Sequence, residues 1–366
     1  MLSKNDPKMM QGKQGAQRDG TPRRRSARIA RNAQIGAETL ENWLPRSCLV
    51  YLTDTRYLPL TLTSVLTAAR SIPASMDVII YLDEVPQNIS KEAATFLIDW
   101  GIKASLRDFD IGALFQNTSR IPLWRDGISR AGFARLGLCG APEGYDTHII
   151  LDGDTLVGGD LRELASTRPA GIAAVSSGHP ETSWSYLYKD RAMPVARDYF
   201  NAGLMVLNAD MWRREAIEDR CMALANDHSL DAKLHRPMRD QEILNIVFGD
   251  TFQRLNDNWN FKRERSWDYS MDMPLIAHFA GKAHPWDPRD MRALPVFRQI
   301  YSEAFSRMPK AMQPAIDTLM LTDKNLKSAV RFKPALGRWN PRHRIAWNPA
   351  QEPLLSHWGS LLPWNR

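Results

Sequence analysis

The sequence predicts an α/β protein in which helices flank a mostly parallel sheet. Short apolar runs alternate with longer amphipathic stretches from residue 48 to residue 107, in the order strand, helix, strand, helix, strand. This order is typical of parallel strands joined by right-handed crossovers. A further apolar run, Ile149–Leu151, is short and lies next to turn formers, as expected of a buried strand in such a sheet. Because ligands bind at the carboxyl ends of parallel strands, the residues that follow these runs are the first candidates for a site.

Local periodicity predicts the elements in chain order. The expected strands cover residues 48–52, 77–82, 102–107, 149–151, 204–207, 252–255 and 274–278. The expected helices cover residues 60–69, 91–100, 126–140, 209–225 and 242–248, and residues 287–323 are expected to be helical with interruptions at Pro309 and Pro314. In the helix over 60–69, the spacing predicts that Leu62, Val65, Leu66 and Ala69 face the core, and that Leu60, Ser64 and Thr67 lie on the other side.

Length and composition limit the fold class further. A chain of 366 residues with 43% hydrophobic residues can form one large domain or two smaller ones around a substantial core. Three widely spaced cysteines indicate neither a disulfide framework nor a zinc site, so we expect a reducing, cytoplasmic location. The apolar runs stay well short of the roughly 18 residues of a membrane span. The basic N-terminus lacks the apolar core of a signal peptide.

Positive charge is concentrated at the two ends of the chain. Residues 1–35 carry nine Lys/Arg and two Asp, and residues 324–366 carry eight Lys/Arg and one Glu, so each end has a net charge of +7. The remaining residues, 36–323, have a net charge of −7. An acidic body argues against nucleic-acid binding, which needs basic charge on the fold itself. The N-terminal end lacks apolar periodicity and is expected to be disordered, either as a solvated tail or as one drawn to anionic lipid.

The C-terminal end is rich in tryptophan as well as in basic residues, with Trp339, Trp347, Trp358 and Trp364. Indoles beside Lys and Arg suit the headgroup region of a membrane, so peripheral contact with an anionic membrane surface is one interpretation. A tail wrapped over the core is the other. The five prolines in this segment disfavour a long amphipathic helix.

Two carboxylates directly follow the apolar run Ile149–Leu151. Asp152 and Asp154 are two residues apart, so in extended chain both side chains face the same way, and Gly153 leaves room between them. Two hard anionic oxygens at the end of a strand favour a divalent cation. An Asp-Gly hairpin turn is the alternative. An EF-hand loop is excluded because Leu156 occupies the position of an oxygen ligand.

Other polar residues lie at the ends of expected elements, and the residues alone leave two interpretations open for each. Asp54 follows the first strand, where it forms a surface turn or contacts a ligand. Arg135 is either solvated or a cation near a diphosphate. The segment Asn201–Gly203 is a turn entering a strand or a place where backbone approaches a ligand. Asp240 is a good helix N-cap, and His278 at a strand end is a structural histidine or a ligand.

Four stretches, taken together, resemble family 8 glycosyltransferases, which are retaining enzymes of the GT-A fold. They are Ile150–Leu156, Tyr199–Asn208, Asp240–Asn245, and His278–Gly281 with Pro285–Trp286, and they occur in the family's order. The pair Trp259–Asn260 also has a counterpart in the family. The resemblance implies a GT-A (Rossmann-like) domain over residues 47–287, preceded by a disordered basic tail, 1–46, and followed by a helical, basic and aromatic extension, 288–366.

The resemblance also implies a role for each matching position. The ligands of Mn²⁺, or of Mg²⁺ as a second candidate, would be Asp152, Asp154 and His278. The residues in contact with the UDP-sugar would be Thr53, Asp54, Arg135, Asp152, Gly153, Asp154, Asn201, Ala202, Gly203, Gly281, Lys282 and His284. The residues acting on the donor sugar and its leaving group would be Asp240, Gln241 and Arg135.

One position departs from the family pattern. The family usually has a lysine just before the final Pro-Trp pair, where it binds the diphosphate, and this chain has His284 there. An imidazole carries a full positive charge less readily than an ammonium group near neutral pH. Either Lys282 takes over this contact or the diphosphate is bound more weakly.

The implied reaction moves glucose or galactose from a UDP-sugar to a hydroxyl group of a glycan or glycolipid, with retention of anomeric configuration, in bacterial lipopolysaccharide or surface glycan synthesis. Front-face attack assisted by the departing phosphate is favoured, since no acid is an obvious nucleophile, and double displacement through Asp240 is the rival. The alternative class is a non-catalytic UDP-sugar-binding scaffold docked on a membrane. A nucleotidyltransferase is disfavoured because its glycine-rich signature is missing after Leu52.

Overall fold

A computed structural model gives the fold of the chain. It describes residues 46–114, 130–138, 140–177, 189, 198–227, 233, 238–262, 274–280, 284–287, 293, 295–321, 356–358 and 360–364. The predictions made for the basic N-terminal tail, for Gly281 and Lys282, and for Trp339 and Trp347 lie outside these residues.

A seven-stranded sheet forms the centre of the fold. Its strands are β1 (Ser47–Asp54), β2 (Met76–Asp83), β3 (Ala104–Phe109), β4 (Thr147–Leu151), β6 (Ile172–Ser176), β7 (Phe200–Asn208) and β8 (Gln253–Arg254), in the order β3-β2-β1-β4-β7-β6-β8. The first four strands in this order are parallel, and β8 is parallel to β6. Among the described strands of this sheet, only β7 is antiparallel to its neighbours, β4 and β6. The predicted α/β class with a mostly parallel sheet is confirmed.

A smaller sheet lies beyond the carboxyl end of β4. It contains β5 (Thr155–Val157), β9 (Phe261–Lys262) and β10 (Ile276–His278), in the order β5-β10-β9. Strand β10 is antiparallel to β5 and places His278 opposite Thr155. Residues from late in the chain therefore meet the segment that directly follows β4.

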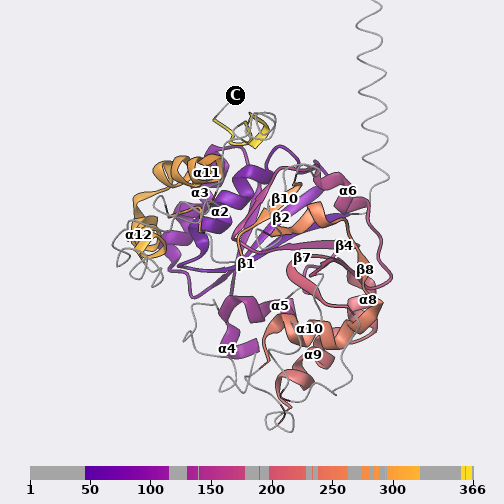
Figure 1. Ribbon diagram of the computed structural model, residues 1–366. Helices are drawn as coiled ribbons and strands as arrows, with labels where there is room; N and C mark the ends of the chain where they lie inside the picture. The colour runs from indigo at the N-terminus through magenta and orange to yellow at the C-terminus, as the bar shows by residue number, and fades with distance from the viewer. Residues whose placement is uncertain are drawn as a thin grey trace, which may run out of the picture. The chain divides into compact units, whose positions relative to one another are not determined.

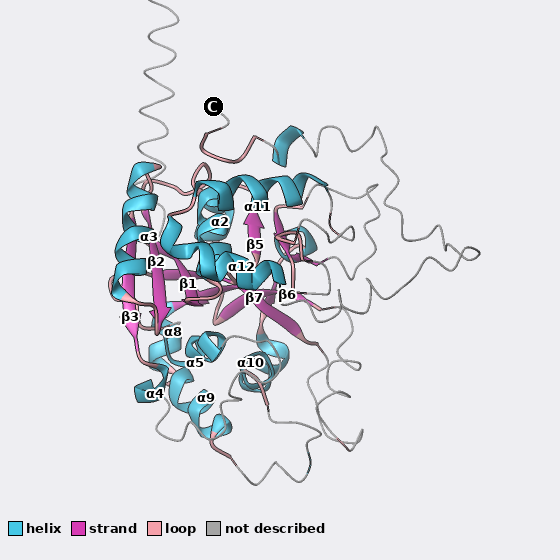
Figure 2. Ribbon diagram, turned by 90° about the vertical axis from the view of Figure 1, so that its left-hand side faces the viewer, coloured by secondary structure: helices cyan, strands magenta, loops and turns pink. Residues whose placement is uncertain are grey.

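Helices cover both faces of the central sheet (Figures 1 and 2). One face carries α2 (Leu58–Ala68), α3 (Gln87–Asp99), α6 (Leu161–Ser166), α11 (Pro295–Arg307) and α12 (Gln313–Leu321). The other carries α4 (Ile111–Leu114), α5 (Arg135–Leu138), α8 (Ala209–Arg214), α9 (Ile217–Ala225) and α10 (Asp240–Phe248). Short 3₁₀ helices cover Arg130–Ala134, Gly249–Thr251, Asp257–Asn260 and Lys310–Met312.

The central strands are buried on both sides, as their continuous apolar sequences predict. In β1, Leu49 and Tyr51 pack into the core beneath α2 and α11, while Cys48 and Val50 pack into the opposite core with α8 and α10. Strand β4 divides in the same way, with Ile150 on the second side. This alternation follows from the two-residue period of a strand.

The predicted orientation of the helix over 60–69 is correct for Leu62, Val65 and Leu66, which lie in the core, and wrong for the opposite side of the helix. Leu60, Ser64 and Thr67 were expected on its outer side, but every residue of α2 is buried. The reason is that β5 lies against this side of the helix, and its polar groups satisfy the helix hydroxyls. Ser64 Oγ bonds Thr155 Oγ1 at 2.8 Å, and Thr67 Oγ1 accepts a hydrogen bond from the backbone N–H of Val157 at 3.0 Å.

Two predicted helices are interrupted. Where residues 126–140 were expected to form one helix, the described part consists of the 3₁₀ turn at Arg130–Ala134 and the four-residue α5. The helix expected over 209–225 is divided into α8 and α9 at Ala216, whose φ of 47° is left-handed. In a continuous helix, Trp212 and Cys221 would lie on opposite sides, whereas the break lets both pack into the same core.

The end of the chain packs on the core instead of leaving it. The Trp358 side chain is fully buried, and its ring meets that of Phe297 edge-on with centroids 5.2 Å apart. Trp364 lies 4.8 Å from Trp100 between ring centroids and donates a hydrogen bond from Nε1 to Glu303 at 3.1 Å. For these two tryptophans, the structure supports the interpretation of a tail wrapped over the core. No helix in the described part of the chain is long and apolar enough to cross a bilayer.

This packing predicts that Trp358→Ala destabilises the protein. Loss of a fully buried tryptophan should lower the free energy of unfolding by about 3 kcal/mol in urea denaturation. As a control, Ile98→Ala on α3 removes a side chain that is 69% exposed and should change it by under about 0.5 kcal/mol. A change below about 1 kcal/mol for Trp358→Ala would contradict the docked position of the terminal segment.

Candidate functional site

Two acids and a histidine converge where the two sheets meet. Asp152 and Asp154 follow β4, and the backbone carbonyl of Asp154 accepts a hydrogen bond from Phe279 N at 3.0 Å, which sets β10 alongside. His278 Nε2 lies 3.5 Å from Asp152 Oδ2 and 3.3 Å from Asp154 Oδ1. One ligand atom from each of the three residues lies within 4.8 Å of the others. The predicted trio is therefore brought together by the register of β5 and β10.

The chemistry of this cluster fits a divalent cation. His278 is buried, and its Nε2 has no hydrogen-bond partner among the described residues, although it lies beside both carboxylates. Its other ring nitrogen, Nδ1, is 2.8 Å from Asn260 Oδ1. A histidine that donates from one nitrogen to an amide oxygen presents the other as a metal ligand. One imidazole and two carboxylates form a donor set that suits Mn²⁺.

The carboxylates and the imidazole shift one another's pKa. Burial alone would lower the pKa of His278, but the negative charges of Asp154 and Asp152 outweigh burial and raise it to about 9. Burial opposes ionisation of Asp152, but the Arg135 guanidinium and His278 overcome it and hold the pKa of Asp152 well below its ordinary value. The cluster therefore favours charged groups that attract one another.

These shifts predict that the stability of EDTA-treated protein falls between pH 6.5 and 9. Because the pKa of His278 is raised in the folded state, protonation stabilises the fold. The contribution is complete below the unfolded pKa of about 6.5 and is lost as the pH rises through about 9, with a size on the order of 3 kcal/mol. Denaturation at several pH values measures it. In His278→Gln the decline should disappear, and an equal decline in both proteins would contradict the assignment.

Arg135 is bound to two acids. Its Nη2 lies 2.5 Å from Asp152 Oδ1, and its Nε lies 2.9 Å from Asp240 Oδ2. Nη1 donates to the backbone carbonyl of Ala202 at 2.6 Å, and the side chain is 7% exposed. The interpretation of a solvated arginine is wrong, because β7 and α10 enclose it. Arg135 links a predicted metal ligand to Asp240, the predicted residue near the donor sugar.

The first turn of α10 lies against the start of β7. Asp240 is the first helical residue and Arg239 is the N-cap, so the N-cap interpretation of Asp240 is wrong. Burial raises the pKa of Asp240, and Arg135 counteracts this in part. Gln241 Oε1 accepts hydrogen bonds from Asn201 Nδ2 at 2.9 Å and from Ala202 N at 3.1 Å. The segment Asn201–Gly203 lies inside β7, so its interpretation as a turn before the strand is wrong.

Two glycines of the predicted site allow close packing. A Cβ on Gly153 would lie 2.4 Å from Thr61 Oγ1 on α2. A Cβ on Gly203 would lie 2.1 Å from His278 Cε1. Neither distance is compatible with a side chain, so both residues let a neighbouring element approach the carboxylates.

The carboxyl end of β1 contributes a further group of residues. Thr53 is buried, and Asp54 Oδ1 accepts a hydrogen bond from the backbone N–H of Tyr57 at 2.8 Å, which forms the turn into α2. Burial raises the pKa of Tyr57 to about 12, with Asp154 and Asp152 among the causes. Tyr57 is thus close to the cluster. Sequence reasoning assigned it no role, although an aromatic residue after the first strand was a usable signal.

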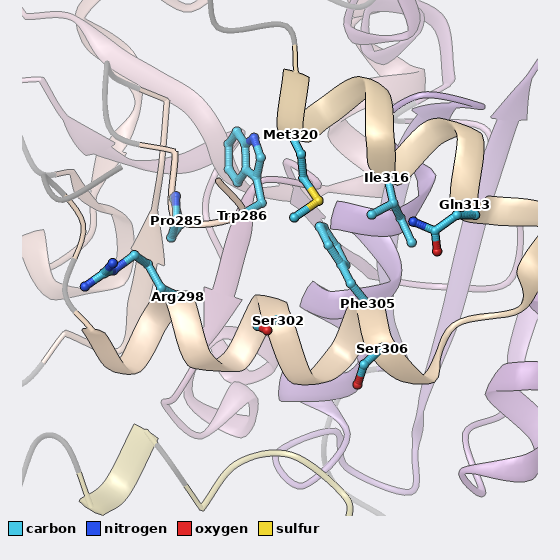
Figure 3. A pocket seen from close by; sticks show the side chains of 9 residues that line it. All are labelled: Pro285, Trp286, Arg298, Ser302, Phe305, Ser306, Gln313, Ile316 and Met320. Carbon is cyan, nitrogen blue, oxygen red and sulfur yellow. The ribbon is translucent and has the colours of Figure 1, made fainter. Parts of the chain in front are cut away.

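The loop after β10 is described in part. His284 stacks on Trp286 with ring centroids 4.8 Å apart and planes at 12°. Trp286 also borders a pocket of about 200 Å³ between α11 and α12 (Figure 3). Its lining includes the apolar side chains of Trp286, Phe305, Ile316 and Met320 and the polar side chains of Arg298 and Ser302. The carboxylates and His278 do not line it.

The comparison with family models decides the assignment. The model described as "Glycosyl transferase family 8" matches residues 48–289. The chain belongs to this family. The match includes both carboxylates, His278 and the start of α10, and the predicted membership in family 8 is confirmed.

Several bacterial proteins are similar in sequence to this family 8 chain. It is 24% identical over 249 residues to a "Putative glycosyltransferase" of Haemophilus influenzae, covering 65% of this chain and 72% of that protein. It is 25% identical over 179 residues to "General stress protein A" of Bacillus subtilis, covering 44% and 60%. It is 26% identical over 174 residues to "Lipopolysaccharide 1,2-glucosyltransferase" of Escherichia coli, covering 43% and 50%. The matched segment thus spans half to three quarters of these relatives.

Solved structures support the fold. The galactosyltransferase LgtC, in a structure with donor and acceptor sugar analogs, has a TM-score of 0.59 and 21% identity, covering 73% of this chain and 99% of that one. The bifunctional glycosyltransferase WbbM has a TM-score of 0.55 and 18% identity, covering 76% and 52%. At these identities the likeness concerns the fold, and it supports the predicted GT-A architecture of this family 8 chain.

Proposed function

We propose that this family 8 chain transfers a hexose, glucose or galactose, from a UDP-sugar to an acceptor hydroxyl with retention of anomeric configuration. The observation that carries the proposal is the convergence of Asp152, Asp154 and the buried Nε2 of His278. Hydrogen bonds through Asn260 connect this cluster to the amide groups of Asn201 and Gln241, where β7 meets α10. Anionic diphosphates need a compensating cation, and hydroxyl-rich sugars need amide partners. Arg135 forms ion pairs with both Asp152 and Asp240, so it connects the proposed cation site to the start of α10.

A divalent cation, Mn²⁺ in the first place, completes the proposed site. Asp152, Asp154 and His278 would hold it. When bound, it supplies Lewis-acid stabilisation of the negative charge on the UDP leaving group. Arg135 orients Asp152 by a charge-assisted hydrogen bond, and His284 and Lys282 are the proposed diphosphate contacts beyond β10.

The arrangement around Asp240 favours front-face attack. A carboxylate paired with a cation is a weaker nucleophile, and Asp240 Oδ2 lies 2.9 Å from Arg135 Nε. This ion pair counteracts in part the burial that raises the pKa of Asp240, and it suits a fixed negative charge beside an oxocarbenium-like centre. Gln241 is held by Asn201 and Ala202 and would orient the sugar. Double displacement through Asp240 remains the competing route, and trapping of a glycosyl adduct on Asp240 would establish it.

The deciding experiment measures release of UDP. The full-length protein is incubated with UDP-glucose or UDP-galactose, with Mn²⁺ or with EDTA, and with a panel of glycan and glycolipid acceptors. We expect UDP release with one donor that requires Mn²⁺ and rises with the correct acceptor. Binding of the donor without release, for all acceptors, would instead support a non-catalytic scaffold. The acceptor in lipopolysaccharide or surface glycan synthesis, the cytoplasmic location and a peripheral membrane contact remain predictions.

A further inference from the structure

A continuous row of side chains leads from the histidine of the cluster to α10. His278 Nδ1 lies 2.8 Å from Asn260 Oδ1, and Asn260 Nδ2 donates to Asn201 Oδ1 at 2.8 Å. Asn201 Nδ2 donates to Gln241 Oε1 at 2.9 Å, and Gln241 Nε2 donates to the hydroxyl of Tyr199 at 3.0 Å. His278, Asn260, Asn201 and Gln241 come from β10, the 3₁₀ helix at Asp257–Asn260, β7 and α10, in that order, and Tyr199 directly precedes β7. Four separate elements therefore share one hydrogen-bonded row.

Two backbone N–H groups of β7 fix the direction of this row. Ala202 N donates to Gln241 Oε1 at 3.1 Å, and Gly203 N donates to Asn201 Oδ1 at 3.1 Å. A backbone N–H can only donate, so the oxygen of each amide must face the strand. The amide nitrogens of Asn201 and Gln241 must then donate along the row, and neither of these two amides can be turned over without losing its bond to the strand.

The direction of the row determines which ring nitrogen carries the proton when the histidine is neutral. Since Asn201 Oδ1 accepts from Asn260 Nδ2, the free oxygen of Asn260 faces His278. An oxygen can only accept, so His278 Nδ1 must carry a proton. Its Nε2 is the atom left without a hydrogen-bond partner among the described residues, and it lies 3.3 Å from Asp154 Oδ1. The lone pair of the neutral ring is therefore directed at the carboxylates.

We propose that Asn260 is a positioning residue that sets the Nδ1–H tautomer of His278 and so makes Nε2 the metal ligand. The backbone of β7 specifies this choice through Asn201, which also belongs to the proposed sugar surface. Asn260 is 3% exposed and lies in a short helix held by the side chain of Trp259 packed in the core. The proposal rests on the metal site of the proposed function. It adds Asn260 to that site and explains why Nε2 of His278 is the ligand atom.

The test replaces the amide of Asn260 in the full chain. Asn260→Leu removes the acceptor for Nδ1–H at similar size, and we expect Mn²⁺ affinity, measured by electron paramagnetic resonance titration, to fall 10- to 100-fold. Asn260→Asp keeps an acceptor for Nδ1–H and loses the donor to Asn201, so its Mn²⁺ affinity should stay within about fivefold of the parent. Asn256→Ala, an exposed cap of the same short helix, should leave Mn²⁺ affinity unchanged.

Nuclear magnetic resonance of ¹⁵N-histidine-labelled protein reads the tautomer directly, with Cd²⁺ as a diamagnetic probe. In the parent and in Asn260→Asp, the proton should lie on Nδ1 of His278 and the metal on Nε2. Asn260→Leu should lose this single state. An unchanged tautomer and Mn²⁺ affinity in Asn260→Leu, with a parent that binds Mn²⁺, would overturn the role of Asn260 alone. A parent that binds no Mn²⁺ would overturn both the role and the proposed function. If Asn260→Leu does not fold, more than tenfold weaker Mn²⁺ binding in Asn260→Asp overturns the proposal.

Discussion

Asp154→Asn should lower the rate of UDP release about a thousandfold. The substitution keeps the shape of the side chain and the backbone hydrogen bond to Phe279, but it removes a full negative charge 3.3 Å from His278 Nε2. Charge stabilisation at a metal centre is worth several kcal/mol, and each 1.4 kcal/mol changes a rate tenfold. Asp154 is a cleaner target than Asp152, whose loss would also leave Arg135 without one of its two acids.

The control for this variant is Asp210→Asn on α8, where the side chain is 80% exposed and paired with Arg213. It should release UDP at the parent rate. Mn²⁺ titration should show that Asp154→Asn binds the ion at least tenfold more weakly, while circular dichroism shows a folded protein. Parental turnover in Asp154→Asn would remove the basis for the proposed metal site.

Gly203→Ala should disrupt the same metal site, because the added methyl group on β7 would collide with His278. The added methyl group would lie 2.1 Å from His278 Cε1 and 2.6 Å from its Nδ1. Gly203 cannot withdraw easily, because its carbonyl accepts from Asp152 N at 2.9 Å and its N–H donates to Asn201. The imidazole must therefore move and give up its contact with Asn260. We expect Mn²⁺ affinity to fall at least a hundredfold and stability to fall by about 1–3 kcal/mol.

Gly132→Ala provides the matched control. A Cβ at Gly132 meets its nearest atom, Arg135 Nη2, at 3.8 Å, which is ordinary van der Waals contact. Isothermal titration of Mn²⁺ into both variants compares them, and thermal denaturation measures the loss of stability. If Gly203→Ala binds Mn²⁺ as tightly as Gly132→Ala does, His278 is not held against β7 as described.

The sequence was most informative where a pattern depends on local geometry. Asp152 and Asp154 could be predicted as partners because they end a buried strand and share a side by its two-residue period. Their meeting with His278 depends instead on the pairing of β5 with β10, and β5 is only three residues long. A strand of three residues is too short to show the alternation of apolar and polar residues by which a strand is recognised. Resemblance to a family supplied what the local pattern did not.

Other features depend on contacts between distant elements. The two ion pairs of Arg135 require β7 and α10 to lie on either side of it, and nothing near residue 135 in the sequence indicates this. The buried hydroxyls of α2 had the same cause, since Ser64 looks like a surface residue until β5 provides a partner. Asn260 was recognised as part of a pair but given no task, because its task depends on which way Asn201 faces.

Helix α11 begins after the last residue that the family model matches, yet its aromatic side chains pack against the residue that follows His278 at the end of β10. Phe297 and Tyr301 both meet Phe279, the neighbour of His278, edge-on. A chimera in which residues 48–289 are replaced by the matching part of another family member would therefore lose this packing. His278 would be held less firmly unless α11 is exchanged together with that part. The suitable junction for such a chimera lies after Arg307, at the end of α11, and not at residue 289, where the match to the family model ends.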